Sequence, residues 1–161
     1  MSAQPLKSSD VLSALRQRYV PKYNFAAPSW VFFEELRVGA GWGKQAEQRI
    51  DAWAMNCWPS KREMIAFEVK VSRSDFLREI ANPRKRRPAL FYSNKFYFVA
   101  PEGLIKSDEL PVECGLIEID SEHKAVIKEA AIWRDCHAPS WSFLASIARR
   151  AALKEQNDGS R

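Results

Sequence analysis

The segment at residues 65–71 reads IAFEVKV, and its alternating pattern most constrains the fold of this chain. Successive side chains of a β-strand point to opposite faces of a sheet, so the apolar residues at positions 65, 67, 69 and 71 share one face. Glu68 and Lys70 are neighbours on the opposite face. We therefore predict a strand over residues 63–72 that keeps a continuous apolar face and carries an acidic and a basic group near its carboxyl end.

Hydrophobic periodicity places further helices and strands on both sides of this strand. Residues 30–38 favour a strand, although Phe32, Phe33 and Leu36 would also form one stripe of a helix. The predicted order is a helix at 11–19, strands at 30–38, 49–58 and 63–72, a helix at 74–80, a strand at 95–100, a hairpin of strands at 115–120 and 125–128, and a helix at 141–154. The last helix would pack through Trp141, Leu144, Ile147 and Ala148. This order favours an α/β fold in which a mixed β-sheet is flanked by α-helices.

Length and composition predict one globular domain over residues 1–161. The 161 residues are 46% hydrophobic and 28% charged, which suits a single domain with a core at about 8–154 and a flexible tail at 155–161. No apolar run is long enough for a membrane helix, and the first residues lack the apolar core of a secretory signal, so we expect a cytoplasmic protein. The three cysteines include no CxxC pair, which predicts neither a disulfide framework nor a zinc site.

The strand predicted at residues 49–58 contributes a second acidic group. Alternation puts Arg49, Asp51 and Trp53 on one face, opposite Ile50, Ala52 and Ala54. If this strand and the next form an antiparallel hairpin, Asp51 can lie beside Glu68. Two carboxylates and a lysine would then converge on one spot of the sheet.

Such a group of residues suits the hydrolysis of a phosphodiester bond. Neighbouring carboxylates repel each other, and a divalent cation with oxygen ligands relieves that repulsion. A lysine beside the cation can orient a water molecule while the cation stabilises the charge that develops on a phosphate. Taken alone, Glu68 and Lys70 would more simply form an ion pair of little energetic value on a half-exposed strand. Asp51 and the basic segment that follows favour the catalytic interpretation.

The excess positive charge of the chain lies directly after this strand. Residues 72–95 contain seven basic and two acidic residues, which accounts for the whole net charge of +5. The charge is densest in PRKRRP at residues 83–88. Such a cluster can neutralise the phosphates of a nucleic acid, although it could also be a solvated turn bracketed by prolines.

Several motifs in this order resemble the PD-(D/E)xK nuclease superfamily and, within it, the MmcB-like DNA repair family and its phage-encoded relatives. These motifs are ELRV at 35–38, RIDA at 49–52, FEVKVSRSDF at 67–76, FYFVAPEGLI at 96–105, and ELP followed by GLIEI between 109 and 119. The resemblance covers about residues 30–120. It implies a restriction-endonuclease-like fold and cleavage of DNA that depends on Mg²⁺, for which Mn²⁺ could substitute.

The resemblance also implies a role for each residue of the motif. Asp51 and Glu68 would bind the metal with the main-chain carbonyl of Val69, and Lys70 would position the attacking water. Many members use a further acidic residue from the first helix or nearby. The predicted helix at 11–19 has none, so Glu35 is the expected substitute and Glu34 the alternative. Ile50 stands where the family name has proline.

The residues after the motif are expected to meet the nucleic acid. Arg73 and Asp75 match the family pattern and could anchor the following helix to the site, or could equally serve as a helix cap and a surface ion pair. The residues that we expect to contact the nucleic acid are Arg73, Arg84, Lys85, Arg86 and Arg87.

The sequence thus predicts a Mg²⁺-dependent deoxyribonuclease in DNA repair or phage DNA metabolism, which could act as a homodimer. The main alternative is an accessory protein that retains the nuclease fold and binds DNA without cutting it. A third possibility is a structural protein in which these charges coincide on the surface, and it predicts no affinity for DNA.

Overall fold

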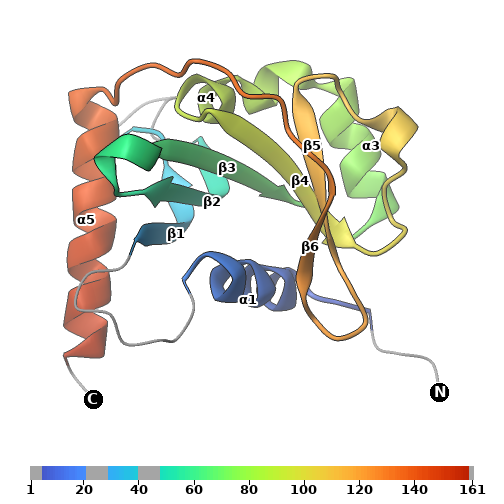
Figure 1. The fold of residues 1–161 in the computed structure, drawn as a ribbon, viewed down its shortest axis with the longest axis horizontal. Coiled ribbons are helices and arrows are strands. Elements are labelled where there is room, and N and C mark those ends of the chain that lie inside the picture. Colours follow the sequence, from blue (N-terminus) through green and yellow to red (C-terminus); the bar gives the residue numbers. More distant parts are fainter. Residues whose placement is uncertain (1–4, 21–28, 40–47, 160–161) are drawn as a thin grey trace.

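A six-stranded mixed β-sheet forms the centre of the computed structural model, which describes residues 5–20, 29–39 and 48–159. The strands lie side by side in chain order (Figure 1). They are β1 (Trp30–Arg37), β2 (Arg49–Asn56), β3 (Glu63–Val69), β4 (Lys95–Pro101), β5 (Cys114–Ile119) and β6 (Ala125–Glu129). The pairs β1–β2, β2–β3 and β5–β6 are antiparallel, whereas β3–β4 and β4–β5 are parallel. The predicted α/β fold with a mixed sheet is therefore confirmed.

Helices cover both faces of the sheet. Figure 1 shows α1 (Ser8–Tyr19) on one side and α3 (Arg73–Ala81) with α4 (Arg87–Phe91) on the other, while α5 (Trp141–Asp158) runs beside β1. Alternation along β3 explains the two layers, because Phe67 joins the core cluster beneath α1 and Ala66 joins the cluster that contains Phe76 of α3. Within the described residues, no helix has the length and apolar character needed to cross a membrane.

Several element boundaries and one helix face differ from the prediction. β3 ends at Val69 rather than at Ser72, and Ser72 instead caps α3 by accepting a hydrogen bond from the main-chain N–H of Asp75. α5 continues to Asp158, so most of the predicted tail is helical, and residues 160–161 lie outside the described part. Its buried side is centred on Phe143, whereas Trp141 and Leu144 are exposed, because the helix packs one position away from the predicted stripe.

Glu35 interrupts the alternation of β1. It has a left-handed backbone with a φ of 52°, which is uncommon for a residue with a side chain. Leu36 therefore lies in the same core cluster as Phe33, and its cross-strand partner Ile50 joins that cluster too. The prediction that Ile50 shares a face with Ala52 is wrong, because alternation holds only while the backbone stays extended.

Candidate active site

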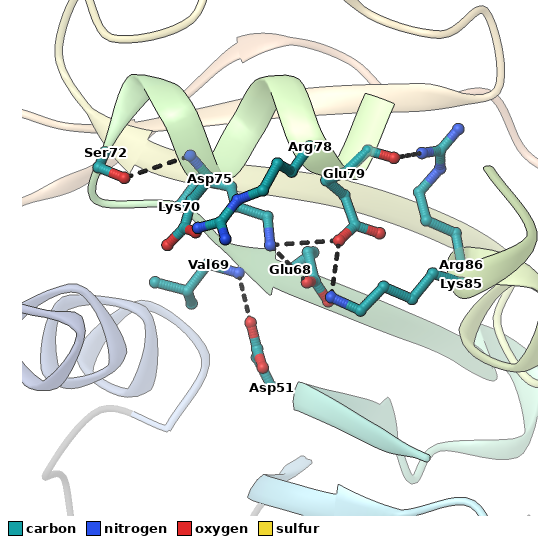
Figure 2. Close-up of polar contacts among 10 residues, drawn as sticks. All are labelled: Asp51, Glu68, Val69, Lys70, Ser72, Asp75, Arg78, Glu79, Lys85 and Arg86. Carbon is teal, nitrogen blue, oxygen red and sulfur yellow. Dashed lines mark hydrogen bonds and ion pairs between the residues drawn. The ribbon is translucent and has the colours of Figure 1, made fainter. Parts of the chain in front are cut away.

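The start of β2 lies beside the end of β3, and this brings two carboxylates together. The antiparallel register pairs Ala52 with Phe67, so Asp51 comes next to Glu68 across the two strands. The main-chain N–H of Val69 donates a hydrogen bond of 2.8 Å to Oδ2 of Asp51 (Figure 2). The predicted pairing of these strands thus exists and holds Asp51 at the carboxyl end of β3.

Lys70 lies beside the two carboxylates and is buried. Its Nζ donates a hydrogen bond of 2.7 Å to Oε1 of Glu68, and only 8% of its side chain is exposed. Its main-chain N–H bonds to the carbonyl of Val99 in β4, which extends the sheet by one residue. The alternative of an ion pair on a half-exposed strand therefore does not fit, since this pair is largely buried and burial makes two charges costly to accommodate.

Glu79 of α3 completes a cluster that the sequence did not predict. Its side chain is 2% exposed, and Oε2 lies 3.4 Å from Nζ of Lys70 and 3.2 Å from Nζ of Lys85. Figure 2 shows the carboxylate pointing from α3 toward both lysines. A sequence signal was available, because Glu79 lies three residues after Phe76 and therefore on the buried side of the helix.

Burial and crowding shift the pKa values of these groups. Burial raises the pKa of Glu68 from its ordinary 4.5 to about 7, and the neighbouring carboxylate of Asp51 adds to the rise, whereas Lys70 opposes it. Burial likewise raises the pKa of Asp51, against the hydrogen bond from Val69. Burial would lower the pKa of Lys70, but Glu68 and Glu79 more than offset this and raise it. Both carboxylates are thus placed where a cation would stabilise their charged form.

Glu35 and Glu34 occupy different sides of β1. Glu34 pairs with Arg16 of α1 at 2.6 Å, which directs it away from the two clustered carboxylates. On β1 and β2, Glu34 pairs with Ala52 and Leu36 pairs with Ile50, so Glu35 lies opposite Asp51. The charge of Glu35 contributes to the raised pKa of Asp51. Of the two candidates, Glu35 is therefore the one placed near the site.

The surroundings of Glu35 are open and basic. Its carboxylate lies 3.4 Å from the guanidinium of Arg49, and both side chains are about half exposed. Glu35 lines a pocket of about 220 Å³ together with Arg37 of β1 and with Arg149 and Arg150 of α5. Strained backbone conformations such as that of Glu35 occur most often at functional sites, where the surrounding structure holds them in place.

The acidic residues fit a hard cation that retains part of its water shell. In the described part of the chain, no three His, Cys, Asp or Glu side chains are gathered as a ready-made metal site. Mg²⁺ needs only one or two carboxylates, because water and substrate phosphate complete its six ligands. Asp51 and Glu68 supply that number of carboxylates from adjacent strands, and Val69, whose carbonyl is the third expected ligand, directly follows Glu68 in the chain.

The basic segment divides into exposed and buried residues. Arg84, Lys85 and Arg87 are exposed, whereas Arg86 is 4% exposed. Arg86 donates a hydrogen bond of 3.1 Å to the carbonyl of Glu79 and lies 3.5 Å from Glu113. The prediction that Arg86 contacts nucleic acid does not fit this placement. The 3₁₀ turn at Pro83–Arg86 turns this one member of the basic run inward.

Arg73 holds α3 against the connection between β4 and β5. Its guanidinium forms a two-pronged ion pair with Glu109 and also donates to the carbonyl of Leu104. Hydrogen bonding to Arg73 lowers the pKa of Glu109 to about 2. Arg73 therefore matches the anchoring interpretation and is not a free phosphate-binding arginine, whereas Asp75 forms an exposed ion pair with Arg78, and the helix cap is Ser72.

Comparison with known proteins supports the fold. No protein-family model matches the chain, and no curated protein matches it. A solved structure, the SPO1766 protein of unknown function from Silicibacter pomeroyi, is similar with a TM-score of 0.62 and 21% sequence identity, over 96% of this chain and 94% of that one. At this identity the similarity shows a shared α/β fold alone.

Proposed function

We propose that this protein is a metal-dependent nuclease that hydrolyses DNA phosphodiester bonds in the cytoplasm, in DNA repair or phage DNA metabolism. The observation that carries this proposal is the convergence of Asp51, Glu68 and Lys70 where β2 begins and β3 ends. The order of the motifs further supports membership of the PD-(D/E)xK superfamily and its MmcB-like family.

Each residue of the cluster has a role in this reaction. Asp51, Glu68 and the carbonyl of Val69 would hold Mg²⁺ or Mn²⁺, which would stabilise the charge that develops on the phosphate and on the leaving oxygen. Lys70 would orient the attacking water and stabilise it as it loses its proton. Glu35 would add negative charge beside Asp51 and thereby favour the cation.

The exposed basic residues would hold the substrate. Arg84, Lys85 and Arg87 would bind the phosphate backbone through contacts that depend on charge and are therefore sensitive to salt. Lys85 links this surface to the buried cluster, because its ammonium reaches Glu79 while its side chain is 65% exposed.

The test is to incubate the purified protein with single-stranded, duplex and branched DNA, with Mg²⁺ or Mn²⁺ and with a chelator. We expect cleavage that requires the metal and is lost in Glu68→Ala and Lys70→Ala. The ion pair between Glu63 and Lys95, 2.7 Å long, joins the starts of β3 and β4 at the opposite end of β3 from the site and provides matched controls. Glu63→Ala and Lys95→Ala should retain cleavage. If no DNA is cut or bound under any of these conditions, the proposal is wrong.

The second candidate function is a DNA-binding accessory protein that does not cut. The observation that favours it is the direct pairing of Lys70 with Glu68, which occupies a carboxylate oxygen that a cation would need. This function predicts salt-sensitive binding without metal-dependent cleavage, and binding that Glu68→Ala leaves intact.

A further inference from the structure

The buried carboxylate of Glu79 is not explained by the stability of the core. Glu79 lies on the inner side of α3 with Phe76, where an apolar side chain would pack without the loss of a charge from water. Buried ion pairs seldom stabilise a protein more than apolar residues of the same volume. A buried glutamate directed at the proposed catalytic lysine therefore suggests a functional role.

The geometry around Lys70 indicates what that role is. The ammonium has three N–H donors. Glu68 takes one at 2.7 Å and Glu79 lies 3.4 Å away as a second acceptor. Among the described residues, no other protein acceptor of Nζ is found, so one donor remains for water. The two acceptors come from different elements, β3 and α3, and hold the ammonium between them (Figure 2).

We propose that Glu79 is a positioning residue that holds Lys70 in place when Glu68 binds the metal. This inference rests on the proposed nuclease function. A cation on Glu68 competes with Lys70 for the carboxylate oxygens, and Lys70 then needs another anchor. Glu79 supplies it without being a metal ligand itself, because both of its neighbours, Lys70 and Lys85, are cations. The remaining N–H of Lys70 is thereby directed at the attacking water.

The position of Glu79 is itself fixed by contacts away from the proposed metal site. Ser72 caps the start of α3, and Arg73 ties the first turn to Glu109. At the far end of the helix, the carbonyl of Glu79 accepts a hydrogen bond from the buried Arg86. These contacts set the distance between Glu79 and the end of β3, as a positioning role requires.

The kinetic test compares Glu79→Gln with the wild-type protein on a cleavable DNA in Mg²⁺. Gln keeps the size and loses the charge. We expect kcat to fall about ten- to hundredfold, because a small displacement of a catalytic group is enough for such a loss, while the KM for DNA changes less than about twofold. Glu79→Asp should recover part of kcat.

A readout independent of cleavage is the side-chain ammonium signal of Lys70 in proton–nitrogen NMR. With Mg²⁺ present, we expect a protected signal in the wild-type protein and in the control Glu63→Gln, and its loss in Glu79→Gln. A Glu79→Gln protein with unchanged kcat, or one that keeps a protected Lys70 signal, would overturn the inference. A wild-type protein that does not cut any DNA would instead refute the proposed function, so the two failures are distinguishable.

Discussion

The charge on Glu68 should lower the stability of the metal-free protein, and Glu68→Gln should relieve this. Burial and the nearby carboxylate of Asp51 raise the pKa of Glu68 from 4.5 to about 7. A tenfold change in proton affinity corresponds to about 1.4 kcal/mol, so the ionised carboxylate destabilises the fold by about 3 kcal/mol. Gln keeps only a weaker hydrogen bond to Lys70, which offsets about 1 kcal/mol of this, so we expect a net gain of about 2 kcal/mol.

The effect should depend on pH with a defined sign. Between pH 4.5 and about 7, folded Glu68 keeps a proton that the unfolded chain has released. The stability that this proton confers is complete below pH 4.5 and is lost as the pH rises through about 7. Glu68→Gln should therefore be more stable than the wild-type protein at pH 8.5 and about equal to it at pH 4.5.

Urea unfolding at both pH values, with a chelator present, measures this difference. Glu122→Gln in the exposed hairpin turn is the control, and we expect a change below about 0.5 kcal/mol at either pH. Adding Mg²⁺ should raise the stability of the wild-type protein alone, because a ligand that binds only the folded state stabilises it. A Glu68→Gln protein that is less stable at pH 8.5, or a difference that does not vary with pH, would refute the reasoning.

Further predictions test the other parts of the structure. Replacing exposed Arg84 and Arg87 by Ala should leave urea unfolding unchanged and reduce the salt dependence of DNA binding by about two counterions in a titration. Replacing buried Arg86 by Ala should instead destabilise the fold by about 3 kcal/mol in urea unfolding, and equal stability would contradict its buried role. Ser72→Ala should reduce stability by about 1 kcal/mol in the same assay, because α3 loses its cap, and Ser72→Asp should restore it. Gly115→Ala should lower the melting temperature, because an added Cβ would lie 2.5 Å from the ring of Tyr97 and 2.6 Å from the main-chain nitrogen of Ala131; an unchanged temperature would contradict this close packing.

The proximity of Asp51, Glu68 and Lys70 could be predicted, because it depends on alternation along one strand and on one strand pairing. Alternation puts Glu68 beside Lys70 on any extended strand, and an antiparallel neighbour needs only the correct register to add Asp51. The left-handed backbone of Glu35 could not be predicted in this way, since apolar periodicity gives no backbone angle for a single residue.

The sequence by itself thus determined the order of the strands and of every α-helix except α4, the mixed sheet, and the adjacency of Asp51, Glu68 and Lys70, because these follow from periodicity and short connections. Only the tertiary structure decided that Glu79 reaches Lys70, that Arg86 is buried, and that Glu35 lies near the carboxylates while Glu34 pairs with α1. The physical reason is that the direction of a side chain on a helix or turn depends on the element packed against it. Such contacts join segments that lie far apart in the sequence, so a local sequence pattern does not specify them.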